Sequence, residues 1–142
     1  MGRVPTRILV TGALGQIGTE LVEALQDKYG KESVIPTDVR EANGCIQLDV
    51  MNRKGIENLI RSEEITDIYH LAALLSATGE KNPDLCWSIN VDGLVNVISA
   101  AKKYDCRLFS PSSIAVFGPD CPKHAPQVTG LNPTTVYGKT KV

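Results

Sequence analysis

Tyr137 and Lys141, near the end of the chain, are two residues whose types and spacing could move a proton. A separation of four residues places both side chains on one face of a helix, about one turn apart. A nearby ammonium favours the phenolate form of a tyrosine, and a phenolate can accept a proton from a substrate hydroxyl. Ser113 could hold the oxygen of that substrate. The alternative is a solvated pair on an amphipathic helix, so the case for catalysis depends on the rest of the chain.

Three glycines at a spacing of three, Gly12, Gly15 and Gly18, directly follow the apolar run 7–10. This pattern predicts a buried strand that breaks at glycines and passes into a helix. Bare backbone and the unpaired N–H groups of a helix start can bind a pyrophosphate. A glycine-rich turn that only reverses the chain is the alternative, but the strand before and the helix after favour a dinucleotide site.

Asp38 closes a second apolar run, twenty residues after Gly18. At this position a carboxylate can accept hydrogen bonds from the ribose hydroxyls of adenosine. A solvated strand end is the alternative. Because an acid there repels a 2′-phosphate, NAD is favoured over NADP, although the nearby Arg40 leaves the choice slightly open.

Composition indicates one globular, soluble domain. The 142 residues carry a net charge of −1, no basic run and 5% aromatic residues, which argues against a nucleic-acid surface. No apolar run is long enough to span a bilayer. The four cysteines form no C-x-x-C pattern, so we expect free thiols in the cytoplasm and no metal site. Gly2 fits a loose myristoylation pattern, which we do not interpret as lipidation because a core strand follows at once.

Strands and helices are predicted to alternate along the chain. The strands are expected at about 7–11, 33–37, 45–48, 67–71 and 107–110. The helices are expected at about 16–29, 53–62 and 82–104, with a last helix capped by Asn132 and Pro133. The fold class is therefore α/β, a Rossmann-type doubly wound parallel sheet with strand order 3-2-1-4-5 and helices on both faces.

Ligands of such a sheet bind beyond the carboxyl ends of its strands. Ala72 and Ala73 follow the fourth strand and are small enough to let a flat ring approach. Ser112 and Ser113 follow the fifth strand at the same rim. His70 is interpreted as a packed core imidazole rather than a catalytic base, and His124 as exposed.

The helix at 82–104 is apolar on more than one side. Such a helix needs a second neighbour besides the sheet, either another helix or a partner subunit. We expect a homodimer through this helix and the helix beginning at 133.

The glycine spacing, Asp38, the run 70–73, Asn90, the serines and the run 137–141 together resemble an extended short-chain dehydrogenase/reductase. This group is the NAD-dependent epimerase/dehydratase superfamily, which includes nucleotide-sugar epimerases. Two segments, 73–80 and 107–119, resemble more closely the short-chain type of L-threonine 3-dehydrogenase.

The resemblance implies a role for each matching residue. The catalytic set would be Ser113, Tyr137 and Lys141, and the substrate contacts would be Ser76, Ser112, Ser113 and Tyr137. The residues that contact NAD would be Gly12, Gly15, Gln16, Ile17, Gly18, Asp38, Arg40, Asp49, Val50, Ala72, Ala73, Leu74, Tyr137 and Lys141. Within that set, Asp49 and Val50 would border the adenine.

The implied reaction is oxidation of the 3-hydroxyl of L-threonine to 2-amino-3-oxobutanoate, in threonine catabolism. Family members are roughly twice as long, so residues 1–142 would be the amino-terminal NAD-binding domain, truncated before the C-terminal substrate domain. By itself this chain is expected to bind NAD weakly and to turn over little substrate. Two alternatives stay open: a nucleotide-sugar epimerase or dehydratase, and a non-catalytic dinucleotide-binding module.

Overall fold

The computed structural model describes residues 6–142 and contains one parallel sheet of five strands in the order β3-β2-β1-β4-β5. The expected fold class and strand order are confirmed. The strands are β1 (Ile8–Thr11), β2 (Val34–Asp38), β3 (Ile46–Gln47), β4 (Asp67–His70) and β5 (Arg107–Phe109). Gly2 and its myristoylation pattern lie outside the described residues.

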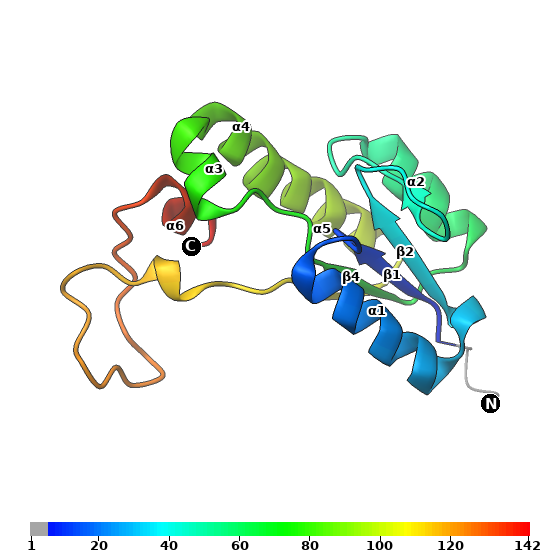
Figure 1. The fold of residues 1–142 in the computed structure, drawn as a ribbon, viewed down its shortest axis with the longest axis horizontal. Helices are drawn as coiled ribbons and strands as arrows, with labels where there is room; N and C mark the ends of the chain where they lie inside the picture. The colour runs from blue at the N-terminus through cyan, green and yellow to red at the C-terminus, as the bar shows by residue number, and fades with distance from the viewer. Residues whose placement is uncertain (1–5) are drawn as a thin grey trace.

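Helices cover both faces of this sheet (Figure 1). On one face, α1 (Gln16–Tyr29) packs with Leu25 against Ile8 and Val10. On the other face, α2 (Arg53–Ser62) and α5 (Gly93–Lys103) enclose Leu9 and Ile68. Successive residues of a strand point to opposite faces, which is why β1 is apolar throughout.

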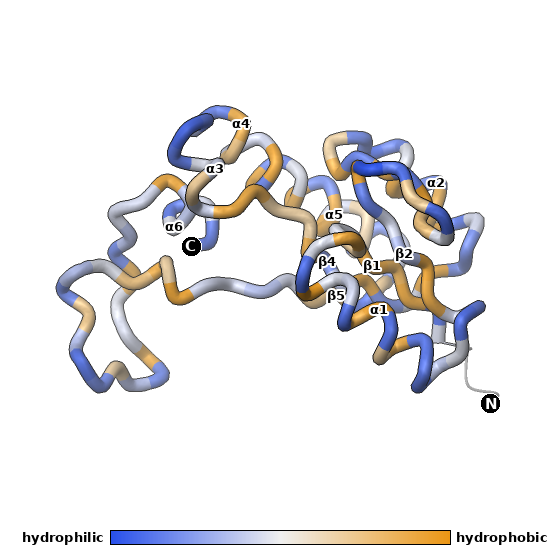
Figure 2. Tube along the Cα trace, in the orientation of Figure 1, coloured by the Kyte–Doolittle hydropathy of each residue, from blue (hydrophilic) through white to orange (hydrophobic). Residues whose placement is uncertain are grey.

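The apolar segments gather on the central strands, whereas the excursion between β5 and the carboxyl end is largely polar (Figure 2). That excursion contains a short 3₁₀ turn, η3 (Ile114–Val116), and leads to α6 (Val136–Thr140). Another 3₁₀ turn, η1 (Lys31–Ser33), joins α1 to β2. Within residues 6–142, no helix combines the length and apolarity needed to cross a membrane.

The start of the last helix differs from the prediction. Asn132 and Pro133 do not cap it; α6 begins at Val136, and its cap is Thr135, whose hydroxyl accepts a hydrogen bond from the Gly138 N–H at 3.0 Å. The Asn132 side chain lies near Asp120 instead. Asn132 and Thr135 are both residue types that cap helices. The helix begins after Thr135, in the position where α6 packs against η3 and α4.

A short helix, α3 (Ser76–Lys81), was not predicted. Its N-cap, Leu75, provides no side-chain hydrogen bond, and its six residues are too few to form a stable helix alone. It packs against α4 (Pro83–Trp87) and α6, next to one another in Figure 1. Tertiary contacts therefore account for α3.

The long helix predicted at 82–104 is present but not uniform. After α4, the segment η2 (Ser88–Asp92) forms a π turn, and α5 then continues to Lys103. A π turn holds one more residue than an α turn and changes which residues share a face beyond it.

Candidate functional site

A cleft of about 610 Å³ opens at the carboxyl edge of the sheet, beyond β1, β2, β4 and β5. This volume lies in the usual range for cofactor sites. The cleft is lined by all residues predicted to contact the cofactor: Gly12, Gly15, Gln16, Ile17, Gly18, Asp38, Arg40, Asp49, Val50, Ala72, Ala73, Leu74, Tyr137 and Lys141. Their individual roles stay predictions.

The glycine loop lies between β1 and α1. Gly12 has φ +68, and a Cβ there would lie 2.7 Å from the backbone nitrogen of Ala72, so only glycine fits the turn. A Cβ at Gly18 would overlap the Gly12 carbonyl and lift α1 off the loop. Gly15, by contrast, meets only the Gly12 carbonyl and lines the cleft at the N-terminus of α1. The bare backbone and helix start that a pyrophosphate requires are thus present.

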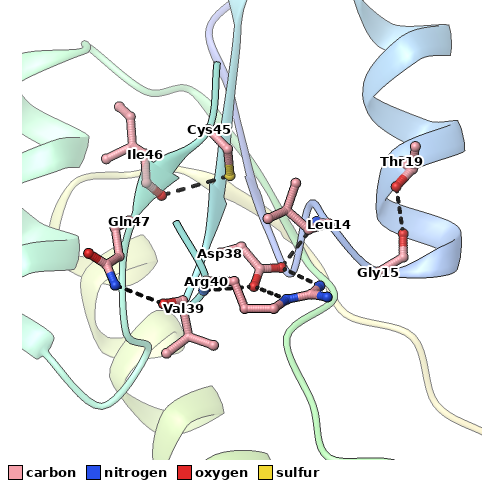
Figure 3. Close-up of polar contacts among 9 residues, drawn as sticks. All are labelled: Leu14, Gly15, Thr19, Asp38, Val39, Arg40, Cys45, Ile46 and Gln47. Carbon is pink, nitrogen blue, oxygen red and sulfur yellow. Dashed lines mark hydrogen bonds and ion pairs between the residues drawn. The ribbon is translucent and has the colours of Figure 1, made fainter. Parts of the chain in front are cut away.

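Asp38, at the end of β2, is almost fully buried and accepts four hydrogen bonds. One oxygen accepts from the backbone N–H and Nε of Arg40, each at 3.0 Å, and the other from the Leu14 N–H at 3.1 Å and Arg40 Nη2 at 3.3 Å. Figure 3 shows the Arg40 side chain extended along the carboxylate. Burial alone would raise the pKa of Asp38, but these hydrogen bonds outweigh it and hold the pKa below its ordinary value. Asp38 is therefore an anion tied to the glycine loop.

Replacing Asp38 with Asn is expected to weaken NAD binding about 10- to 100-fold, because the predicted contact with the ribose hydroxyls loses a charged acceptor. Binding of NADP should fall far less, since the negative charge that repels a 2′-phosphate is removed as well. Titration calorimetry with both dinucleotides measures this difference, and Glu41→Gln, at an exposed acid three residues away, is the control. Equal losses for NAD and NADP would contradict the assigned role.

Tyr137 and Lys141 lie beside one another in the lining of the cleft, as their spacing predicted. Lys141 Nζ is 5.8 Å from the centroid of the Tyr137 ring and donates to the Pro111 carbonyl at 3.4 Å. The Ser112 hydroxyl donates to the Lys141 carbonyl at 3.3 Å, so the segment after β5 is connected to the end of α6 twice. Burial lowers the pKa of the Lys141 ammonium, and the Cys86 thiol acts in the opposite direction. The arrangement places a cation beside the Tyr137 ring in the lining of the cleft.

The predicted substrate serines are placed differently from one another. Ser112 lines the cleft, whereas Ser76 and Ser113 are not part of its lining. Ser113 caps η3, where its hydroxyl oxygen accepts a hydrogen bond from the Ala115 N–H at 3.2 Å. Ser76 begins α3 next to the exposed Leu75. The contact of these serines with substrate stays a prediction.

Asn90, on the π turn, connects two walls of the cleft. It is 4% exposed, accepts from the Leu74 N–H at 2.7 Å and donates to the Leu74 carbonyl at 3.1 Å. It also donates to the Thr140 hydroxyl at 3.1 Å, and Thr140 donates to the Tyr137 carbonyl. The sequence marked Asn90 only through the family resemblance, because its partners lie 16 and 50 residues away.

Apolar residues that the sequence did not single out complete the cleft. They are Val39, Leu48, Met51, Leu71, Leu75, Leu85, Ile89 and Pro111. Leu75 and Leu85 are 70% and 50% exposed. No local pattern distinguishes them from core residues, since only the packing of α3 and α4 brings them to the cleft.

His70 is packed in the interior, as predicted. It is 4% exposed, and its Nδ1 lies 2.8 Å from the Thr11 hydroxyl, which accepts from the Ala72 N–H at 3.3 Å. His124 lies exposed in the excursion after β5. Within residues 6–142, no cluster of three or more His, Cys, Asp or Glu side chains could hold a metal ion.

The model of the NAD dependent epimerase/dehydratase family matches residues 8–142, nearly the entire chain. The chain belongs to this family. NAD is the cofactor of this epimerase/dehydratase family, and the bare glycine loop, the buried Asp38 anion and the volume of the cleft all fit it.

Solved structures similar to this family member include L-threonine 3-dehydrogenases. A monomeric L-threonine 3-dehydrogenase from a metagenome is 55% identical with a TM-score of 0.91, over 94% of this chain and 45% of that protein. The Trypanosoma brucei L-threonine 3-dehydrogenase is 45% identical with a TM-score of 0.91, over 95% of this chain and 45% of that protein.

Other relatives carry broader descriptions. An uncharacterized epimerase/dehydratase of Staphylococcus aureus strain USA300 is 48% identical over 96% of this chain and 45% of its own length. The Thermus thermophilus UDP-glucose 4-epimerase, solved in complex with NAD, is 26% identical with a TM-score of 0.84, over 96% of this chain and 47% of its own. This chain thus spans less than half the length of the relatives it matches.

Proposed function

We propose that this chain is the NAD-binding part of an L-threonine 3-dehydrogenase, which oxidises the 3-hydroxyl of L-threonine to 2-amino-3-oxobutanoate. The observation that carries the proposal is the pair Tyr137 and Lys141 in the lining of the NAD-type cleft, in a chain 55% identical to a protein of that activity. Bound NAD supplies the hydride acceptor.

Residues of this chain would perform the proton chemistry. Tyr137 accepts the proton of the substrate hydroxyl, and the ammonium of Lys141, 5.8 Å from the centroid of its ring, would stabilise the phenolate. Ser112 and Ser113 follow β5, close in sequence to the Pro111 carbonyl that binds Lys141, and are assigned to the substrate oxygen. The glycine loop, Asp38 and the Asp49–Val50 pair hold the two ends of the dinucleotide.

The test uses the polypeptide as the cell makes it, because these 142 residues span less than half of the related dehydrogenases. Mixed with NAD and L-threonine, it is expected to accumulate NADH, followed by absorbance. UDP-sugars should give no accumulation. A polypeptide that binds NAD tightly yet forms no NADH from L-threonine would refute the proposal.

A nucleotide-sugar epimerase is the second candidate, favoured by the similarity of this chain to 47% of the Thermus thermophilus UDP-glucose 4-epimerase. An epimerase returns the hydride to its substrate, so UDP-sugar would be converted without net NADH.

The homodimer through helices α4, α5 and α6 is part of the proposal, supported by exposed Trp87, Val95 and Ile98; the metagenome relative is described as monomeric. The four free thiols suit the cytoplasm, which we propose as its location.

A further inference from the structure

The loop 48–51, between β3 and α2, forms one wall of the cleft and includes the predicted adenine contacts Asp49 and Val50. A short loop can hold a ligand only if its own backbone is fixed. The Leu48 N–H donates to the Asp38 carbonyl at the end of the neighbouring strand β2 at 2.8 Å, and within the loop the Met51 N–H donates to Asp49 Oδ1 at 2.9 Å. Neither contact anchors the loop to the helical layer behind it.

The residue that connects the loop to the helical layer is Asn96, a half-buried residue of α5. Its Nδ2 donates to the Val50 carbonyl at 3.1 Å and lies 3.4 Å from the Met51 carbonyl, 46 and 45 residues away in sequence. One turn earlier on the same helix, Gly93 leaves room for Val50, since a Cβ there would lie 2.8 Å from Val50 Cγ2. Val50 is consequently 5% exposed, held between Asn96 and the helix backbone.

In this loop a hydrogen-bond donor, the Val50 N–H, is next in sequence to an acceptor, the Asp49 carboxylate. In the part of the chain that the structure describes, no backbone contact uses the Val50 N–H, and Asp49 is an acceptor with only one oxygen engaged by Met51. A donor next to a carboxylate complements the edge of adenine, which has an acceptor nitrogen beside an amino group. Hypoxanthine, with a carbonyl in place of that amino group, does not match this edge.

We propose that Asn96 is a positioning residue for the adenine end of the cofactor cleft. Its amide fixes the Val50 and Met51 carbonyls, and through them the donor and acceptor that distinguish adenine from hypoxanthine. Asn90, on the π turn of the same continuous helix, fixes Leu74 on another wall. One helix therefore holds two walls of the cleft through two asparagine side chains.

The test measures binding of NAD and of nicotinamide hypoxanthine dinucleotide to the polypeptide as the cell makes it, by titration calorimetry. Wild type is expected to prefer NAD. Asn96→Ala should weaken NAD binding about tenfold and leave the hypoxanthine analogue nearly unchanged, so that the preference for adenine shrinks. Asn96→Asp should lose more, because a carboxylate would face two carbonyl oxygens without a donor. Asn96→Gln, which keeps both donors on a longer side chain, should recover part of the affinity.

Asn58→Ala, at an exposed asparagine on α2, is the matched control and should change neither affinity. A purely structural role for Asn96 would weaken both dinucleotides by the same factor, and that result would overturn the proposal. A wild type without preference for adenine would overturn it too. Thermal melting identifies variants that do not fold. If Asn96→Ala does not fold, the two affinities of Asn96→Gln are compared with those of wild type: a loss confined to NAD supports the proposal, and an equal loss for both dinucleotides overturns it. The outcome depends on the cofactor alone and is independent of whether threonine is the substrate.

Discussion

Tyr137→Phe is expected to lower threonine-dependent NADH formation about a thousandfold while leaving NAD affinity nearly unchanged. The phenol oxygen is the only atom removed, and it is the atom to which we assign the substrate proton. The ring, which lies 5.8 Å from Lys141 Nζ, remains in place. The measurement is steady-state NADH formation by the polypeptide as the cell makes it, together with NAD titration.

Tyr104→Phe is the matched control, since Tyr104 packs against the core at the end of α5, outside the cleft lining. It should keep normal turnover. A Tyr137→Phe variant that retained full activity would exclude Tyr137 as the base and would leave the chain as a binding module. Loss of NAD affinity in parallel with turnover would instead indicate that Tyr137 serves the cofactor rather than the proton.

Acidification is expected to destabilise the fold through His70. Burial, and secondarily the charge of Lys141, lowers the pKa of His70 from 6.5 to about 4. As the pH falls from 6.5 towards 4, the unfolded chain takes up a proton that the folded chain refuses, so the free energy of unfolding decreases. The full loss is about 3 kcal/mol and is complete below the folded pKa. Above pH 6.5 His70 contributes no pH dependence.

Urea unfolding of wild type and His70→Asn at pH 7.5 and pH 4.5 measures this loss as a difference, about 3 kcal/mol at most, because carboxylates titrate equally in both proteins. Asn can keep a hydrogen bond to the Thr11 hydroxyl, which lies 2.8 Å from His70 Nδ1. The variant should therefore lose less stability on acidification than wild type. His124→Asn, at the exposed histidine, should behave as wild type. Identical pH dependence in wild type and His70→Asn would show that His70 protonates freely in the fold.

Local signals were sufficient wherever an element forms from its own periodicity. The bounds of α1 (Gln16–Tyr29) and α2 (Arg53–Ser62) were predicted as observed. Every predicted strand end lies within about one residue of the observed end. The start of α6 was wrong because Asn132 and Thr135 are both plausible caps, and the choice depends on what α6 packs against. The helix α3 was missed because it has no side-chain cap and takes its stability from its neighbours.

The sequence by itself determined the parallel sheet, its strand order and the cofactor. The reason is that short sequence patterns carry these signals: the glycine loop, Asp38 at the end of a strand, and the alternation of strands and helices. Only the tertiary structure decided how the cleft is held together. It brought Asn90 to the Thr140 hydroxyl and Asn96 to the Val50 carbonyl. Such contacts join residues as far as 50 positions apart, so they depend on how whole elements pack and leave no periodic trace in the chain.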